Sequence, residues 1–440
     1  MKKIIALLLV SAFISPYAFA DEVSKYIKKM HFGRGAKESV LIVDVDKNKI
    51  LYKKNENEIL NPASVLKVLT FGRAYKILGK GYKFETELLQ DSSNNIYVKL
   101  GADVLLTQDD LNLLISKLKK VEINEIFIDD SIFENEKYPT TWLDEDKWPT
   151  QGEITPYIID KNIVEIALNR SSLTKNVDII QNDEYKIPIV NELKIGEVQD
   201  IKIARLYGEN SPIINLQGYI EKDEVISLPI LNPEINFNIK LNKALEENKI
   251  LYDKCINVKK TPLEASKIAS VSHSIEEISS LVLHNSDNFV SEIVLKVATS
   301  KYFAKDKVLF TDVIKMLEES YAPYMSQKDR FADASGVSRQ NLLTTKTIYS
   351  IFSELLKNND FKNLMESANQ GTMADRLLFL QDNLKVKTGT MRDLSSICAN
   401  FKTRKNTNII LVSIVQDTKM RKSLLKNFEN TLIGKIYKIY

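Results

Sequence analysis

The sequence contains few of the residues on which many enzymes and secreted domains depend. Among 440 residues there are two cysteines, Cys255 and Cys398, and three histidines. Two cysteines cannot build a disulfide-based scaffold, so we expect two free, mostly buried thiols, with a Cys255–Cys398 pair as the alternative. No histidine lies in an H-E-x-x-H or similar metal-ligand spacing, and the glycine-rich loops that bind nucleotides are absent. We therefore expect no metal and no cofactor.

Long apolar segments and an excess of one charge are also missing. No segment after the first twenty residues is long and apolar enough to span a bilayer. Residues 1–20 combine Lys2 and Lys3, an apolar run and the small residues of A-F-A, which predicts a secretory signal peptide cleaved after Ala20. Its removal lowers the formal charge from +3 to +1, and no Lys/Arg block typical of a nucleic-acid-binding protein stands out. We expect an exported, periplasmic protein without a transmembrane segment in its mature form.

The pattern of strands and helices predicts an α+β protein with an interruption. A strand at 38–46 and a returning strand at 50–53 are expected to form a hairpin, followed by a buried helix. A β-rich block with one helix, at 109–120, continues to about residue 258. Helical periodicity then returns, with helices expected at 274–284, 288–300, 311–320 and 344–357, three strands between 384 and 415, and a last helix at 421–437.

This order predicts an antiparallel sheet with helices on its faces and an insertion in the middle of the chain. We assign residues 1–20 to the signal peptide, 21–84 to the N-terminal part of the catalytic domain, 85–258 to an inserted β-rich region and 259–440 to the C-terminal part of the catalytic domain. The lysine-rich helix at 421–437 is expected to pack on the sheet, with binding to a membrane surface as the alternative.

The stretch N-P-A-S-V-L-K, residues 61–67, places a hydroxyl and an amine in an otherwise apolar segment. Asn61 and Pro62 predict the start of a helix, so Ser64 falls in its first turn and shares a face with Lys67. A lysine in apolar surroundings has a lowered pKa and can act as a base, while the free amide of a first-turn serine can bind an oxyanion. By itself S-x-x-K is common and favours an ordinary capped helix.

Two further motifs follow in a recognisable order. The segment H-N-S-D-N-F, residues 284–289, carries Ser286 and Asn288 in a break between two expected helices. The segment V-K-T-G-T, residues 386–390, carries Lys387, Thr388, Gly389 and Thr390 on an expected strand. S-x-x-K, S-x-N and K-T-G in this order form the signature of penicillin-recognising serine acyl-transferases. Each motif is weak alone, but the ordered triple favours one catalytic site over three unrelated structural features.

The cleavage of an amide assigns a role to each of these residues. Ser64 attacks the carbonyl and Lys67 takes its proton, while Ser286, kept in place by Lys67 and Lys387, relays a proton towards the leaving nitrogen. Asn288 holds an amide on the acyl side of the substrate, and Lys387 with Thr388 receives the substrate carboxylate. Gly389 lets the substrate lie close against the strand. The amides of Ser64 and Thr390 form the oxyanion hole.

Over nearly the whole mature chain the sequence resembles the peptidase S13 family, the D-alanyl-D-alanine carboxypeptidases of class C low-molecular-mass penicillin-binding proteins. Beyond the three motifs, the resemblance includes V-D-V-D before the first motif, I-D-D-S-I-F with Trp142, N-S-D-N-F-V-S-E, D-A-S-G-V-S-R-Q-N at 333–341 and G-T-M-A-D-R-L at 371–377. It implies a penicillin-binding-protein/β-lactamase-like transpeptidase fold whose extra domains lie between the first two motifs. It also implies peptidoglycan stem peptides as substrates and β-lactam antibiotics as covalent inhibitors.

Two segments depart from the pattern of the family. Where the family usually has D-G-S-G, this chain has Asp333-Ala334-Ser335-Gly336, and G-A-D-V-L-L-T at 101–107 stands where the family has a G-D-P element. We expect neither segment to touch a residue that is assigned to the chemistry.

More than one activity is compatible with these motifs. A carboxypeptidase that removes the terminal D-Ala and an endopeptidase that cuts D-Ala-to-diaminopimelate crosslinks use the same acyl-enzyme chemistry, and one protein can do both. A β-lactamase would need a base for rapid deacylation, and no glutamate comparable to that of class A enzymes can be assigned. A sensor or wall-binding module without turnover is expected to lose Lys67, Ser286 or Lys387, and all three are present.

Overall fold

The two ends of the chain build one antiparallel sheet, which we call the main sheet. The structure is a computed structural model that describes residues 16–134, 136–147, 151–172, 176–206 and 211–440, so the expected signal sequence up to residue 15 lies outside the described residues. The strands lie in the order β14-β15-β16-β1-β2, with bounds β1 Lys37–Asp44, β2 Lys49–Lys54, β14 Leu384–Met391, β15 Leu394–Lys402 and β16 Asn408–Gln416. Strand β1 pairs with β16 along its whole length, which joins the N-terminal hairpin to the C-terminal strands.

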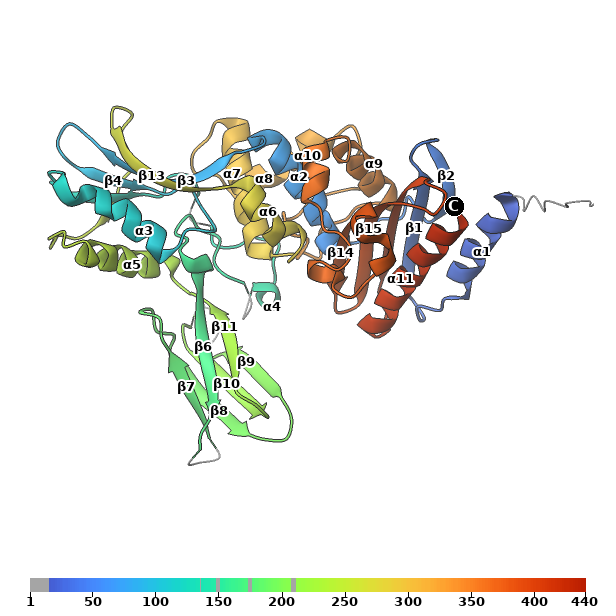
Figure 1. Cartoon of the computed structure of the whole chain (residues 1–440), viewed down its shortest axis with the longest axis horizontal. Helices are drawn as coiled ribbons and strands as arrows, with labels where there is room; N and C mark the ends of the chain where they lie inside the picture. Colours follow the sequence, from blue (N-terminus) through green and yellow to red (C-terminus); the bar gives the residue numbers. More distant parts are fainter. Residues whose placement is uncertain (1–15, 135, 148–150, 173–175, 207–210) are drawn as a thin grey trace, which may run out of the picture.

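Helices cover both faces of the main sheet (Figure 1). Helices α1 (Pro16–Lys29) and α11 (Lys422–Ile439) pack on one face, where Ile397, Ala399 and Phe401 of β15 contribute to the core. The opposite face, which includes Cys398, shares one hydrophobic core with a group of helices. These are α2 Leu66–Leu78, α6 Ile275–Leu283, α7 Asn288–Phe303, α8 Phe310–Tyr321, α9 Thr345–Leu355 and α10 Asn359–Leu364. Side chains of β15 are buried on both faces because alternate residues of a strand point to opposite sides. This arrangement confirms the predicted antiparallel sheet with helices on its faces.

A second five-stranded sheet lies in the segment between the first two motifs. Its order is β12-β5-β4-β3-β13, with bounds β3 Lys83–Gln90, β4 Ile96–Lys99, β5 Ile126–Asp129, β12 Asn257–Val258 and β13 Ser266–Ser274. Helices α3 (Gln108–Ile115) and α5 (Pro233–Glu247) share a hydrophobic core with this sheet. The 3-10 helix η2 (Ser116–Lys120) continues α3.

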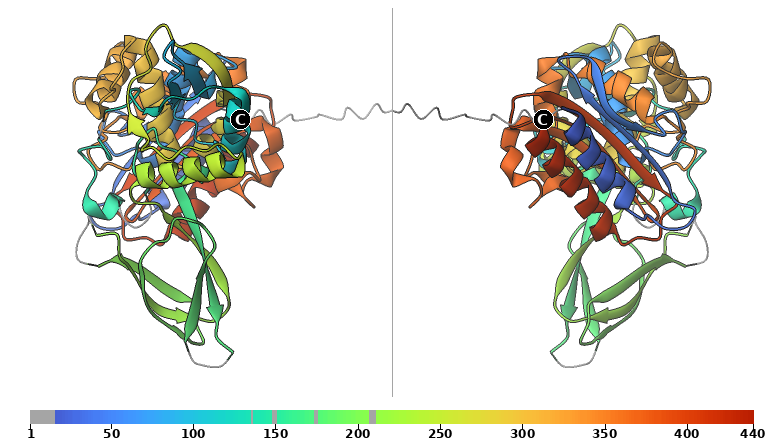
Figure 2. Two further views of the ribbon diagram at one scale, coloured as in Figure 1. Left: turned by 90° about the vertical axis from the view of Figure 1, so that its left-hand side faces the viewer. Right: turned by 90° about the vertical axis from the view of Figure 1, so that its right-hand side faces the viewer.

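Two three-stranded sheets form a separate lobe, which we call the β-lobe (Figures 1 and 2). Their orders are β8-β10-β9 and β11-β6-β7, with bounds β6 Ile163–Arg170, β7 Val177–Gln181, β8 Ile189–Ile195, β9 Asp200–Arg205, β10 Ile214–Ile220 and β11 Glu224–Pro229. Strand β6 alternates buried Val164, Ile166 and Leu168 with more exposed residues, so one face of each sheet forms the lobe's core. The β-rich texture of this part of the sequence therefore corresponds to short strands, which pair antiparallel except for the parallel pair β8 and β10.

The predicted boundaries of the inserted region, 85 and 258, stay predictions. Strand β13 pairs with β3 along its length, with His273 opposite Phe84, although β13 lies beyond residue 258. We therefore propose that the inserted region runs from Lys83 to Ser274. Helix α6 begins directly afterwards, and its predicted capping box is present, because the Ser274 hydroxyl accepts from the Glu277 amide and Glu277 accepts from the Ser274 amide.

The prediction of a single helix in the β-rich block is wrong, because α5 also lies there. Asn232 and Pro233 open this helix, and its buried residues include Phe237, Leu241 and Ala244. These positions have the spacing of an amphipathic helix, so the signal was present in the sequence. Helix α1 and the short helices α4 (Asp144–Lys147) and α10 were not predicted either.

Both cysteines are free thiols, but they lie in different surroundings. Cys398 is buried in β15, whereas Cys255 is exposed, so the expectation of two buried thiols is wrong for Cys255. In the part of the chain that the structure describes, no helix is long and apolar enough to cross a bilayer.

Candidate active site

The first motif lies in a strained turn at the start of α2. A 3-10 turn, η1 (Ala63–Val65), precedes the helix, and the Asn61 side chain accepts a hydrogen bond from the Ala63 amide at 2.8 Å. Ala63 has a φ of 45°, a left-handed conformation that costs energy for a residue with a side chain. Gly336 (φ +80°) packs against this turn so closely that a Cβ there would lie 2.1 Å from the Ala63 carbonyl oxygen. The strained turn holds Ser64 half-buried, one turn before Lys67.

Lys67 connects the first two motifs. Its Nζ is fully buried and donates to Ser64 Oγ at 3.0 Å, to Asn288 Oδ1 at 2.6 Å and to the Ser335 carbonyl oxygen at 2.6 Å. The amine thus lies within hydrogen-bond distance of the hydroxyl that it is expected to deprotonate. The contact with Ser335 contradicts the expectation that the departing segment 333–336 does not touch the chemistry.

The surroundings of Lys67 favour its neutral form. Burial and the charge of the nearby Lys387 lower the pKa of Lys67 to about 7, against the opposing fields of Asp333 and Asp287. Desolvation disfavours an ammonium ion, and a second cation disfavours it further. A lysine with this pKa is divided between its neutral and charged forms near neutral pH, as a general base requires.

Glu292 holds the segment that contacts Lys67, and the sequence motifs did not single it out. This buried carboxylate of α7 accepts from the amides of Ala334 at 3.0 Å and Ser335 at 2.9 Å. Burial raises the pKa of Glu292 to about 8, and the nearby Asp333 adds to the rise. Its contacts direct the Ser335 carbonyl towards Lys67. The only signal in the sequence was that both segments belong to the stretches that resemble the S13 family.

The third motif contributes a buried cation. Lys387 of β14 is fully buried, and its Nζ has no hydrogen-bond partner among the described residues. Burial lowers the pKa of Lys387 to about 8, against the opposing field of Glu366. A buried donor without a partner is costly, which is typical of groups that bind a ligand. Lys387 is therefore suited to bind an anionic group of a substrate.

Thr388 is placed by a chain of hydroxyl contacts next to Lys387. Its Oγ1 lies 2.8 Å from Thr372 Oγ1, and Thr372 also lies 2.8 Å from the Glu366 carboxylate. Thr372 is part of the G-T-M-A-D-R-L stretch and of the 3-10 turn η4 (Gly371–Met373). The position of the Thr388 hydroxyl therefore depends on a segment that no catalytic motif identified.

Gly389 lets β14 lie against the nucleophile turn. A Cβ at this position would be 2.9 Å from the Ser64 amide nitrogen and 2.4 Å from Ser396 Oγ. Any side chain would therefore displace η1 or β15. The next residue, Thr390, lies on the same strand opposite Ser395, with its side chain exposed. These contacts bring the backbone of β14 next to Ser64.

Ser286 lies in the loop between α6 and α7, in the left-handed conformation with a φ of 62°. The expectation that Lys67 and Lys387 hold its side chain is wrong in this structure. The described acceptors of Lys67 are Ser64, Asn288 and Ser335, and Lys387 has none. The following residue, Asp287, caps α7 by accepting from the Val290 amide at 3.0 Å. The loop backbone, rather than a lysine, sets the place of Ser286.

The structure thus brings parts of all three motifs around Ser64. A hydroxyl, an amine with a lowered pKa and a buried cation are the elements of acyl transfer to serine. Among the described residues, no group of three or more His, Cys, Asp or Glu side chains could hold a metal ion.

Comparisons with known proteins identify relatives over nearly the full length. The sequence profile of the D-Ala-D-Ala carboxypeptidase 3 (S13) family matches residues 20–434. The D-alanyl-D-alanine carboxypeptidase DacB of Haemophilus influenzae is 22% identical, with 92% of each chain covered. The crystal structure of penicillin binding protein 4 from the same organism has a TM-score of 0.82 at 20% identity, covering 94% of this chain and 99% of that one. Its complex with a novel β-lactam, with the same coverage, has a TM-score of 0.75 at 19% identity. At these identities the solved structures show the fold alone, and they confirm the predicted fold class.

Proposed function

Because the chain belongs to the D-Ala-D-Ala carboxypeptidase 3 (S13) family, and is therefore a serine-type carboxypeptidase, we propose that it cleaves the stem peptides of peptidoglycan through an acyl-enzyme on Ser64. Ser64 Oγ attacks the carbonyl carbon of the penultimate D-Ala and Lys67 Nζ takes the hydroxyl proton. The negative oxygen of the tetrahedral intermediate is bound by the amides of Ser64 and Thr390.

The intermediate then collapses with loss of the terminal residue. The carbon–nitrogen bond breaks, and the proton that Lys67 took from Ser64 passes through the Ser286 hydroxyl to the leaving nitrogen, which leaves Lys67 neutral again. A water molecule then attacks the carbonyl carbon of the resulting ester while Lys67 takes a proton from the water. The bond between this carbon and Ser64 Oγ breaks, and Lys67 returns the proton to Ser64 Oγ. Throughout, Asn288 holds the acyl-side amide, while Lys387 and Thr388 receive the terminal carboxylate of the substrate. Gly389 allows the β14 backbone to lie beside the bound peptide.

The single observation that supports this proposal most strongly is the contact of Lys67 Nζ with Ser64 Oγ at 3.0 Å. A sensor or wall-binding module would not need a base with a lowered pKa beside its serine. We keep that non-catalytic function as the alternative.

The same chemistry also supports endopeptidase activity and inhibition by β-lactams. An endopeptidase differs from a carboxypeptidase only in the group that leaves, so we propose that the site also cuts D-Ala crosslinks between stem peptides. A β-lactam presents an amide and a carboxylate in the same relation as D-Ala-D-Ala, so it is expected to acylate Ser64 and inhibit the protein. The predicted signal peptide supports export to the periplasm, where peptidoglycan lies.

The decisive experiment has two readouts. Benzylpenicillin should add one drug mass to the peptide that contains Ser64, and Ser64→Ala should abolish this adduct while the protein stays folded. Purified sacculi digested with the mature protein should lose terminal D-Ala, and crosslinked dimers should yield monomers if endopeptidase activity is present. An adduct on another serine would refute the assignment of the nucleophile. Labelling without release of any product would favour the sensor.

A further inference from the structure

Helices α1 and α11 lie side by side at one end of the molecule, on the outer side of the main sheet (Figure 2). They run in opposite directions, since Lys435 Nζ lies 3.2 Å from Glu22 Oε1 and Phe428 stacks on Tyr26 with ring centroids 5.8 Å apart. The buried apolar residues of both helices share one core with the sheet. Their polar sides therefore face away from the sheet.

The end of α1 lies next to the start of α11. Thr418, in the loop before α11, donates from Oγ1 to the Phe32 carbonyl oxygen at 2.6 Å, and the Phe32 ring meets the Phe428 ring edge-on with centroids 5.0 Å apart. Exposed cations gather where these segments meet. They are Lys28, Lys29, Lys419, Arg421, Lys422 and Lys426, and we call these six residues the basic face.

The positive charge of the basic face is not neutralised by the protein. None of its six side chains forms a hydrogen bond or an ion pair with the described residues. The acidic side chains that the structure describes on the two helices have other partners. Glu22 is paired near the far end of α11, and Glu429 is buried beside Arg376 at 2.8 Å. In the loop before α11, Asp417 lies 3.9 Å from Lys37.

The concentration of charge contrasts with the rest of the protein. The predicted mature chain has a formal charge of only +1, so cations and acids nearly balance over the molecule as a whole. On the basic face they do not. A local excess of unpaired cations attracts an anionic partner and costs little to desolvate while the side chains remain exposed.

An apolar side chain lies within the same surface. Leu424 is 49% exposed and stands between Lys422 and Lys426 in the first turns of α11. Ammonium groups beside an exposed apolar side chain match the surface of an anionic bilayer, where phosphates attract the cations and the boundary with the acyl chains accepts apolar atoms. A wholly polar polyanion would offer no comparable partner to Leu424.

We propose that the basic face is a docking surface for a bilayer that contains anionic phospholipids. The lipid phosphates supply the negative charge that the protein does not. The turn that carries Ser64 packs into the core on the opposite side of the main sheet from α1 and α11. Docking therefore leaves the candidate active site free to meet its substrate, and it does not depend on the chemistry proposed at Ser64.

Sedimentation of the mature protein with lipid vesicles tests this surface. The protein should bind vesicles of equal parts phosphatidylglycerol and phosphatidylcholine, and at least about tenfold more weakly vesicles of phosphatidylcholine alone. Each lysine removed from the basic face should weaken binding by about fivefold. The variant that combines Lys28→Gln, Lys29→Gln, Lys422→Gln and Lys426→Gln should therefore bind roughly a hundredfold more weakly or less than that.

A matched control removes the same number of charges from the opposite end of the molecule. Lys117, Lys119, Lys120 and Lys249 are exposed lysines around α3 and α5, which lie far from α1 and α11 (Figure 1). Changing all four to Gln should leave vesicle binding within about twofold of the wild type, since charges beyond the screening length of about 10 Å contribute little.

The two quadruple variants decide the proposal. Equal binding of the wild type to both kinds of vesicle would overturn it, and so would an equal loss in the control variant, which would show a general effect of net charge. Binding to lipid-free sacculi that depends on the basic face, without binding to anionic vesicles, would assign the surface to the cell wall and also overturn it.

Benzylpenicillin labelling shows whether the variants are folded. Both quadruple variants should label within about twofold of the wild type, because the changed residues lie far from Ser64. If the basic-face variant did not label, Lys28→Gln and Lys422→Gln would be tested singly, and the absence of a loss of about fivefold in either would overturn the proposal. If the wild type itself were not labelled, the proposed function would fail, while vesicle binding would still decide the docking surface.

Discussion

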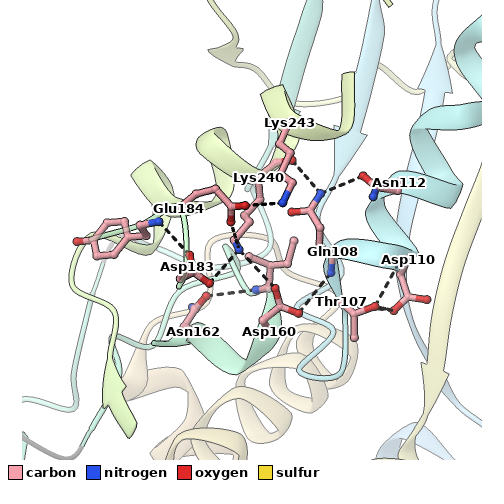
Figure 3. Close-up of polar contacts among 12 residues, drawn as sticks. Thr107, Gln108, Asp110, Asn112, Asp160, Asn162, Asp183, Glu184, Lys240 and Lys243 are labelled. Carbon is pink, nitrogen blue, oxygen red and sulfur yellow. Dashed lines mark hydrogen bonds and ion pairs between the residues drawn. The ribbon is translucent and has the colours of Figure 1, made fainter. Parts of the chain in front are cut away.

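The catalytic part and the inserted region both bury lysines, and they use them in opposite ways. Lys67 and Lys387 have no carboxylate within ion-pair distance among the described residues, and burial lowers the pKa of each. Lys240 of α5, also buried, lies 2.9 Å from Glu184, 3.0 Å from Asp183 and 3.9 Å from Asp160 (Figure 3). Burial alone would lower the pKa of Lys240, but its hydrogen bonds to Glu184 and Asp183 outweigh this and raise it.

The difference shows that burial does not by itself make a lysine reactive. A buried amine surrounded by carboxylates stays charged and ties elements together, and Lys240 connects α5 to the segment between β7 and β8. A buried amine that contacts only neutral acceptors, such as a hydroxyl, an amide oxygen and a backbone carbonyl, loses its proton more easily. Lys67 has these three acceptors.

The strongest way to test the comparison is to exchange the head group at both positions. Lys67→Arg should lower the rate of Ser64 acylation by benzylpenicillin by about a thousandfold, because guanidinium stays protonated and cannot act as a base. Lys240→Arg should acylate within about twofold of the wild type, since the ion pairs with Asp183 and Glu184 can re-form. Stopped-flow or mass-spectrometric acylation rates give both numbers. Near-normal acylation by Lys67→Arg would mean that another group is the base.

The pH dependence of acylation should depend on Lys67 and not on Lys240. Below the Lys67 pKa of about 7 the amine is protonated, so the acylation rate should fall by up to tenfold per pH unit and be about a hundredfold lower at pH 5 than on the high-pH plateau. Above this pKa the rate should level off. Lys240→Met should leave the midpoint in place, because Lys240 does not act on Lys67. A rate that stayed constant from pH 5 to 9 would contradict a titrating base.

A smaller effect tests whether the unpartnered Lys387 binds the substrate carboxylate. In Lys387→Met, kcat/KM for a D-Ala-D-Ala peptide should fall about tenfold more than kcat/KM for a thiolester that lacks the terminal carboxylate. A tenfold difference corresponds to the loss of one hydrogen bond to a charged group. The ratio of the two substrates is the measurement, since any change in the Lys67 pKa affects both alike. Equal losses would assign Lys387 to the shape of the site.

The smallest effect on activity concerns Lys240. Lys240→Met leaves Asp183 and Glu184 without their buried partner, and the free energy of unfolding should fall by about 2 kcal/mol, since the partly exposed carboxylates regain water. Urea unfolding measures this loss, and benzylpenicillin acylation before unfolding should stay within about twofold of the wild type. If the variant lost acylation while it remained folded, the inserted region would control the catalytic base more directly than the contacts indicate.

Local patterns were enough to predict most of the fold. Alternating and periodic apolar residues identified the hairpin β1–β2, the strands β14 to β16 and the helices α6 to α9 and α11. The capping box at Ser274 could be predicted from the sequence because its hydrogen bonds join residues three positions apart. Helix α5 was missed although its spacing was present, since the surrounding β-rich texture outweighed it.

For the site, the sequence by itself determined the three motifs, their order and the family, because these depend on residue types and short spacings. Tertiary structure alone decided which atoms meet. Ser335 contacts Lys67 through a backbone carbonyl, which any residue type could offer, so the contact cannot be predicted from the residue type at this position. Glu292 contacts Ser335, and Thr372 contacts Thr388, each from a separate segment of the chain. The lowered pKa of Lys67 likewise depends on how deeply the folded chain buries it, and burial is a property of the packed molecule rather than of a motif.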